Sequence, residues 1–113
     1  MVKSSYVPDK GDLVWINFTP QSGHEQMGKR PALTISPKEY NKKVGLALFC
    51  PITSKEKGYP FEVEIPAGLK VTGVVLSDQV RTIDWNARKV QIVDHVPSEC
   101  IAEVQEKISK LIL

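Results

Sequence analysis

The stretch FEVEI, residues 61–65, decides the fold that this sequence predicts. Its apolar side chains Phe61, Val63 and Ile65 alternate with two glutamates, and this two-residue period is that of a β-strand. A strand of this kind buries one face and exposes the other to water, as strands of antiparallel sheets commonly do. We therefore predict a mostly antiparallel sheet.

Further short strands are predicted on both sides of this stretch. Residues 13–18 are apolar on both alternating faces except at Asn17, which is typical of a strand that is covered on both sides. A loop is expected from Thr19 to Arg30. The remaining predicted strands, separated by Gly and Pro, are residues 31–35, 45–53, 74–76, 80–83 and 90–93.

Two helices complete the predicted fold. The sequence SPKE at 36–39 predicts a short helix that begins with Ser36 as N-cap, Pro37 at the first helical position and Glu39 as capping-box partner. We expect this helix to end near Asn41. The C-terminal segment predicts an amphipathic helix, because apolar residues recur there at helical spacing, at Ile101, Val104, Ile108 and Leu111.

These elements predict an α+β fold that is mainly β. We expect a small, strongly curved antiparallel sheet or partly open barrel, with a short helix and with the C-terminal helix packed on the sheet. The 113 residues fit one domain, residues 1–113, because no linker or composition shift marks a boundary. This fold class supports many functions, so a site has to be argued from particular residues.

Composition places the chain among ordinary globular proteins. It is 42% hydrophobic and 25% charged, and its net charge of +2 is too small by itself to indicate nucleic-acid binding. Between residues 38 and 57 there are five lysines against two glutamates. This asymmetry suits a surface that faces a polyanion, although a charge run of this size is more often a solvated face.

Several classes of chemistry lack their sequence signatures. Cys50 and Cys100 lie far apart and are interpreted as small buried hydrophobic residues in a reducing cytoplasm. No apolar N-terminal segment resembles a signal peptide or membrane span. His24 and His95 are also far apart, no metal-ligand spacing occurs, and no phosphate-binding glycine loop is present. We expect neither a metal site nor nucleotide hydrolysis.

Polar residues gather where the predicted strands end. If these ends meet at one rim of the sheet, the rim carries a carboxylate, a guanidinium, hydroxyls and an ammonium group. Such a set can cleave RNA without a metal: a base takes the proton of the ribose 2′-OH, cations stabilise the phosphoryl oxygens, and an acid protonates the leaving 5′-oxygen. The residues are Asn17, Glu25, Arg30, Thr53, Ser54 and Lys57.

Each of these residues also has a structural interpretation. Glu25 could act as the base or orient one, and Arg30 suits an electrostatic clamp because its guanidinium presents a fixed fork of donors and rarely deprotonates. Thr53 could donate a hydrogen bond to the same phosphoryl oxygens. A mixed loop of Glu, Lys and Arg is nevertheless usually a solvated connection, and a threonine at a strand end usually forms a turn.

Three stretches taken together carry a family resemblance: GDLVW at 11–15, EQMGKRPAL at 25–33 and KGYPFEV at 57–63. With these motifs the chain resembles the MazF/PemK-like toxins of bacterial toxin–antitoxin systems, almost from end to end. The resemblance implies an SH3-like, partly open barrel and a homodimer. It also implies a sequence-specific endoribonuclease that cleaves single-stranded mRNA without a metal or other cofactor, leaves 2′,3′-cyclic phosphate and 5′-hydroxyl ends, and inhibits translation and growth.

The resemblance also assigns roles to residues. The essential arginine of the family falls on Arg30, its threonine on Thr53 and its loop glutamate on Glu25, so these three are the expected catalytic residues. Many relatives have aspartate where this chain has Asn17, which rules out a charged acid or base at that position but still allows a hydrogen bond to RNA. Further expected RNA contacts are Gln26, Ser54, Lys57 and Gln79.

Two aromatic residues have alternative roles. Trp15 and Trp85 could stack on bases, but packing in the core or at a dimer interface is the favoured interpretation. His24 and His95 are expected at the surface or beside the site rather than as catalysts.

The expected protein partner is a MazE-like antitoxin whose largely disordered C-terminal segment blocks the active-site grooves. Two other functions stay open. One is a binding toxin of the same fold that poisons gyrase, although such relatives rely on a C-terminal tryptophan segment and this chain ends in Lys110-Leu111-Ile112-Leu113. The other is a non-catalytic interaction module, an alternative that Asn17 leaves open.

Overall fold

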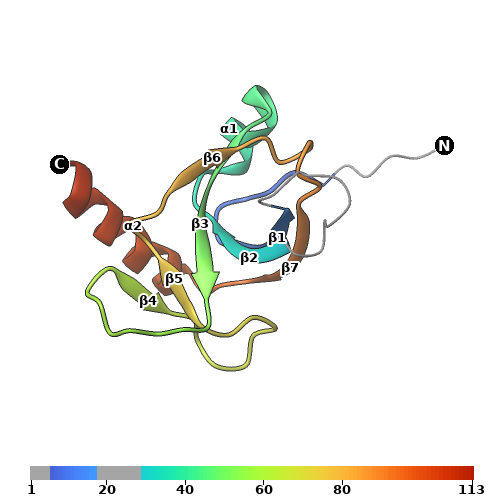
Figure 1. The fold of residues 1–113 in the computed structure, drawn as a ribbon. Helices are drawn as coiled ribbons and strands as arrows, with labels where there is room; N and C mark the ends of the chain where they lie inside the picture. The colour runs from blue at the N-terminus through green and yellow to red at the C-terminus, as the bar shows by residue number, and fades with distance from the viewer. Residues whose placement is uncertain (1–5, 18–28) are drawn as a thin grey trace.

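The structure is a computed structural model that describes residues 6–17 and 29–113 (Figure 1). Within these residues seven strands form one antiparallel sheet accompanied by two helices, so the prediction of a mainly β, α+β fold is confirmed. The elements are β1 (Asp12–Asn17), β2 (Lys29–Thr34), α1 (Lys38–Val44), β3 (Ala47–Thr53), β4 (Glu62–Glu64), β5 (Val74–Leu76), β6 (Arg81–Ile83), β7 (Gln91–His95) and α2 (Ser98–Ile112).

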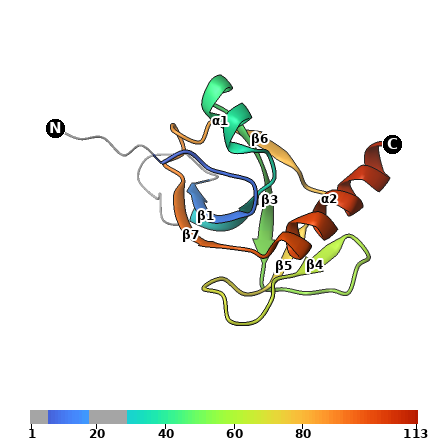
Figure 2. The ribbon, with the colours of Figure 1, turned by 180° about the vertical axis from the view of Figure 1, so that it is seen from behind.

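The sheet is organised around β3, which pairs with three other strands. The strand order is β4-β5-β3-β2-β1-β7, and β6 pairs with β3 outside this order. On one edge β3 pairs with β2. On its other edge it pairs first with β6 and then, from Ile52 onward, with β5. Figures 1 and 2 show the resulting curved sheet, with α1 at one end and α2 lying beside β4 and β5 at the other.

Two hydrophobic clusters cover opposite sides of β1, β2 and β3. Leu13 belongs to the first cluster and its neighbour Val14 to the second, and both side chains are fully buried. This confirms the prediction that the first strand is covered on both faces. Helix α2 completes the first cluster by burying Cys100, Ile101 and Val104 against it. Burial of each such aliphatic side chain contributes roughly 1.5–3 kcal/mol to the stability of the fold.

The start of the second strand differs from the prediction. The charges at 29 and 30 suggested a loop that continues to Arg30, but β2 begins at Lys29. Pairing with β1 extends the strand, because Lys29 lies opposite Asn17 and Arg30 opposite Ile16. A neighbouring strand therefore overrides the local preference of two charged residues for a loop, and Arg30 projects from regular structure.

The first helix also differs, in both its cap and its length. Pro37 occupies the N-cap position with no side-chain cap, so the predicted capping box of Ser36 and Glu39 does not form. The Ser36 hydroxyl is buried and instead donates to Asn41 Oδ1 at 2.6 Å. The helix continues past Asn41 to Val44, where Gly45 at φ 77° supplies the left-handed residue that ends it. The next strand consequently begins at Ala47 rather than 45.

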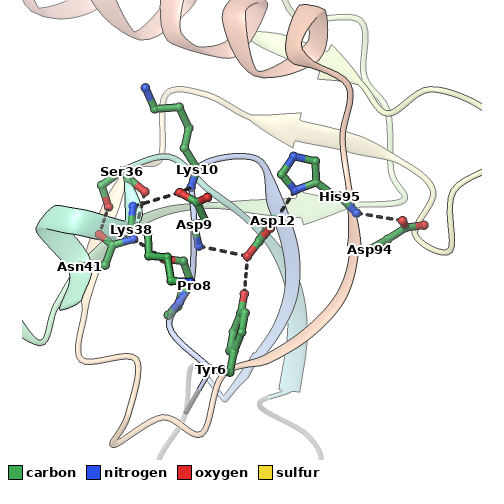
Figure 3. A network of polar contacts seen from close by, with 10 residues as sticks. All are labelled: Tyr6, Pro8, Asp9, Lys10, Asp12, Ser36, Lys38, Asn41, Asp94 and His95. Atoms are coloured by element: carbon green, nitrogen blue, oxygen red, sulfur yellow. Dashed lines mark hydrogen bonds and ion pairs between the residues drawn. The ribbon is translucent and has the colours of Figure 1, made fainter.

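A polar network ties the segment before β1 to the rest of the fold (Figure 3). The buried Asp12 carboxylate accepts hydrogen bonds from the Tyr6 hydroxyl at 2.6 Å and the Asp9 amide at 3.0 Å, and its other oxygen lies 2.8 Å from His95 Nδ1. Burial and the neighbouring Asp12 carboxylate raise the pKa of Tyr6 far above its usual value. The predicted surface position of His95 is confirmed, since its side chain is 58% exposed.

A second part of this network centres on the buried Asn41. Its amide nitrogen donates to the carbonyl of Pro8 at 2.7 Å and to that of Ser36 at 3.0 Å. Its main-chain carbonyl accepts the indole N–H of Trp85 at 3.0 Å. Trp85 is half-buried against the second cluster, which supports the packing interpretation of this residue rather than base stacking.

Candidate active-site groove

A groove opens where β2 and β3 part. Their ladder pairs Ala32 with Pro51 and continues away from the groove. On the groove side, β2 stays paired only with β1, as far as Lys29, while β3 turns to β5 and pairs Thr53 with Val74. The fork between the two strands encloses a volume of about 480 Å³. Its walls come from Lys29, Arg30 and Pro31 on one side and from residues 52–55 and Thr72 on the other.

The fork places Arg30 and Thr53 on the same face of the sheet. Alternate residues of a strand share a face, so Arg30 lies on the face of Ala32, and Thr53 lies on the face of Phe49. Ala32 and Phe49 both belong to the second hydrophobic cluster. The predicted guanidinium and hydroxyl therefore project on one face, at the first positions beyond the closed part of the ladder.

Thr53 is held so that its hydroxyl can donate. The backbone N–H of Lys55 donates to Thr53 Oγ1 at 3.1 Å, which is the turn-forming contact typical of a hydroxyl at a strand end. Because the oxygen acts there as an acceptor, its own proton is available for a partner in the groove. The structural and the functional interpretations of Thr53 are thus compatible.

The positive charge of the groove exceeds what the motifs predicted. Lys29, Arg30 and Lys55 all line it, and no carboxylate is among the lining residues that the structure describes. The Arg30 side chain is exposed, and within residues 6–17 and 29–113 it forms no ion pair with a carboxylate. Three cations beside three hydroxyls, those of Thr53, Ser54 and Thr72, make an anion-binding site that suits phosphoryl oxygens.

Gly73, which was not predicted as a site residue from the sequence, shapes the wall next to Thr53. Its φ is +123°, and a Cβ at this position would lie 2.3 Å from the Thr53 carbonyl oxygen and 3.3 Å from Ser54 Cα. Only glycine allows this approach without moving Thr53. The one available signal was a glycine directly before the strand Val74–Leu76. Lys29, Lys55 and Thr72 were also missed, because no motif marks a lysine or threonine as part of a groove.

The other predicted site residues are distributed unevenly. Ser54 lines the groove. Asn17 lies opposite Lys29 at the end of β1, and strand alternation directs its side chain to the face opposite that of Arg30. Its carbonyl accepts a hydrogen bond from Arg88 Nη1 at 3.1 Å. Lys57 and Gln79 lie outside the groove lining, in the segments after β3 and β5.

Glu25 and Gln26, together with the nearby His24, fall outside the described residues.

Cys50 and Cys100 are buried, as predicted, and burial raises the pKa of the Cys50 thiol to about 12, which makes it a poor nucleophile. In the part of the chain that the structure describes, no three His, Cys, Asp or Glu side chains are grouped to hold a metal ion. Neither described helix is long and apolar enough to span a membrane.

Known proteins match the sequence of this chain over nearly its whole length. The Escherichia coli K12 protein "Endoribonuclease toxin MazF" is 47% identical over 109 residues, which span 96% of this chain and 97% of that protein. The E. coli "Endoribonuclease toxin ChpB" is 35% identical over 118 residues, covering 99% of each chain. Both relatives therefore match along their full length.

Solved structures give the same result, and a family model names the family. The crystal structure of MazF (Form-I) from Deinococcus radiodurans is 54% identical to this chain, with a TM-score of 0.86 over 96% of this chain and 98% of that one. MazF in a MazE–MazF complex from the same organism matches with a TM-score of 0.85 at 47% identity, over 96% and 97%. Residues 9–112 match the model described as "PemK-like, MazF-like toxin of type II toxin-antitoxin system". The chain belongs to this PemK/MazF toxin family.

Proposed function

We propose that this protein is the toxin of a type II toxin–antitoxin pair and a sequence-specific endoribonuclease that cleaves single-stranded RNA in the Arg30–Thr53 groove. The observation that carries the proposal is the placement of Arg30 and Thr53 on one face of a fork lined by three cations. Relatives at 47% and 35% identity are named as endoribonuclease toxins, which supports the same activity here.

The proposed chemistry assigns separate tasks to the residues. Arg30 holds the scissile phosphate with its donor fork and stabilises the charge that develops on the phosphoryl oxygens. The Thr53 hydroxyl donates a further hydrogen bond to these oxygens. Glu25 takes the proton of the ribose 2′-OH or orients the group that does. The 2′-oxygen then attacks phosphorus, the bond to the 5′-oxygen breaks, and the products carry a 2′,3′-cyclic phosphate and a 5′-hydroxyl.

In this proposal the positive charge that a metal would supply comes from the protein. Lys29, Arg30 and Lys55 surround the phosphate, so cleavage should proceed in EDTA. Ser54, beside Thr53, is proposed to contact the RNA directly. Asn17, Gln26, Lys57 and Gln79 are proposed as contacts to nucleotides on either side of the cleaved one.

We also propose a setting for this activity. The toxin acts in the cytoplasm as a homodimer of a single-domain chain, residues 1–113, and a MazE-like antitoxin blocks its grooves. The MazE–MazF complexes solved from D. radiodurans support the proposal of an antitoxin partner. A basic groove would accept an acidic, partly apolar peptide for the same electrostatic reason that it accepts RNA.

The decisive experiment incubates purified protein with a long single-stranded RNA in EDTA and maps the 5′-hydroxyl ends. Wild-type protein should cut at a short recurring sequence, whereas Arg30→Ala and Thr53→Val should cut at least about 100-fold more slowly. Arg81→Ala is the matched control, because Arg81 is also an exposed strand arginine but lies on β6, away from the groove lining.

Two outcomes would reject the proposal. One is intact RNA across a broad set of sequences with folded wild-type protein. The other is growth arrest that persists unchanged in the Arg30→Ala variant, which would point to a toxin that acts by binding, such as a gyrase poison.

A further inference from the structure

Pro31 lies at the point where the β2–β3 ladder stops, and its main chain is oriented toward β3. The N–H of Ile35, just beyond β2, donates to the carbonyl of Leu48 in β3 at 2.8 Å. Main-chain groups of a strand alternate between its two neighbours, so Leu33 and Pro31 also face β3. The register pairs Leu33 with Cys50, which puts Pro31 opposite Ile52. Proline has no N–H, and so the ladder has no donor for the Ile52 carbonyl.

Ile52 offers its main chain, not its side chain, to the groove. Leu48 uses both its N–H and its carbonyl on the β2 side, since its N–H donates to Ser36 Oγ at 2.9 Å and its carbonyl accepts from Ile35. By the same alternation the carbonyl of Ile52 faces β2. Residue Ile52 as a whole is only 3% exposed, and its side chain packs in the first hydrophobic cluster. Pro31 and Ile52 both line the groove, so this carbonyl opens between them.

A second strand proline makes the contrast clear. Pro51 has the opposite alternation, so its missing N–H faces the other edge of β3. Along this edge, the pairing of β3 with β6 ends at Phe49, opposite Arg81. Its pairing with β5 begins at Ile52, opposite Val75, so Pro51 lies between the two ladders. No ladder needs a donor at this changeover. Both prolines are half-buried strand residues, but only Pro31 leaves an acceptor open toward the groove.

We infer that Pro31 keeps the Ile52 carbonyl open as a hydrogen-bond acceptor for the nucleotide held between Arg30 and Thr53. The groove side chains of these two residues act as donors to phosphate, whereas a ribonucleotide also presents donors of its own, on its 2′-hydroxyl and on its base. A main-chain acceptor next to the phosphate site meets this need. The inference rests on the proposed function and makes Pro31 a positioning residue.

The test is Pro31→Ala, which returns the missing N–H. The new amide should bond to the Ile52 carbonyl, appear as a slowly exchanging amide at position 31 in NMR hydrogen exchange, and leave the melting temperature at or above that of the wild type. RNA cleavage measured as kcat/KM should fall about tenfold, the value of one lost hydrogen bond. Pro51→Ala should cleave RNA at nearly the wild-type rate.

The source of the donor is identified by non-cleavable oligonucleotides that carry a 2′-deoxy sugar at the cleaved position. Wild-type protein and Pro31→Ala are compared for binding of this oligonucleotide, of its 2′-O-methyl analogue and of analogues whose base lacks its amino group. Removal of a base amino group that weakens only wild-type binding identifies the base as donor. If the wild type cleaves RNA faster than Pro31→Ala but both bind the 2′-deoxy oligonucleotide with equal affinity, the 2′-hydroxyl is the donor.

The inference and the proposed function can fail separately. The inference is overturned if position 31 gains no protected amide, or if Pro31→Ala cleaves RNA as fast as the wild type. If wild-type protein leaves RNA intact, the proposed cleavage fails, and the inference then depends on the binding of RNA that keeps its 2′-hydroxyl groups. Equal affinity of the wild type and of Pro31→Ala for this RNA overturns the inference as well.

Discussion

Replacement of Gly73 by alanine should damage cleavage far more than it damages folding. The added Cβ would lie 2.3 Å from the Thr53 carbonyl oxygen, and real Cβ contacts are essentially never shorter than 3.0 Å. The obstacle is main chain, which cannot rotate away as a flexible side chain would. Either β5 or the end of β3 must therefore move, and with it the Thr53 hydroxyl.

The magnitude follows from strain and displacement together. Alanine at φ +123° beside a main-chain clash should reduce the free energy of unfolding by roughly 2–4 kcal/mol. For a chain of this size that lowers the melting temperature by roughly 8–16 °C. A shift of a catalytic group by on the order of 1 Å lowers the rate by about 100-fold.

Gly68→Ala provides the matched control. Gly68 also has a positive φ, +94°, but a Cβ there would meet nothing within 4 Å. Its cost is backbone strain alone, about 1–2 kcal/mol, and Thr53 stays in place. Thermal unfolding and RNA cleavage are measured on both variants at a temperature where both are folded. Similar cleavage rates for Gly73→Ala and Gly68→Ala would refute the argument that Gly73 positions Thr53.

Three further outcomes are expected. Arg30→Lys keeps the charge but loses the planar fork, so kcat should fall by about 100-fold with unchanged thermal stability; full activity would show that charge alone suffices. Asp12→Ala leaves the Tyr6 hydroxyl and the Asp9 amide without their acceptor and should lower the unfolding free energy in urea by about 3 kcal/mol. The pKa of Cys50 is raised from 9.0 to about 12, so the native protein binds the thiol proton more tightly than the unfolded chain does. The free energy of unfolding in urea should therefore be unaffected by this group below pH 9 and should decrease between pH 9 and 12. A Cys50→Ala variant whose stability declines equally over this range would contradict the prediction.

The sequence predicted those elements whose pattern is local. Period-two alternation located β4, and helical spacing located α2, because each pattern reports which face of one segment is buried. The predicted start of β2 was wrong because it also relied on a local pattern. Lys29 and Arg30 resemble loop residues in the sequence, but in the fold they pair with β1. Topology, not local preference, decided that boundary.

The errors at Ser36 and Gly73 have a shared physical cause. A capping box is a local signal, but Ser36 is buried and its hydroxyl serves Asn41 and the β3 backbone, a demand that the sequence SPKE does not contain. The need for glycine at 73 arises from Thr53, twenty positions earlier in the chain. The family resemblance predicted Arg30 and Thr53 as site residues, whereas the neighbours that position them depend on contacts between distant segments.

The change of partner along β3 has a consequence for how this groove can vary. A strand that is hydrogen-bonded to β6 over one half and to β5 over the other cannot slide along either without breaking both ladders. The position of Thr53 along the sheet relative to Arg30 is therefore fixed by the pairing of β3 with β2, β5 and β6. The loop at 54–61 is free of this constraint, because it begins beyond the last paired residue of β3. If the proposed function holds, changes in residues 56–61 of this loop should alter which nucleotides the protein prefers and leave the placement of Arg30 and Thr53 unchanged.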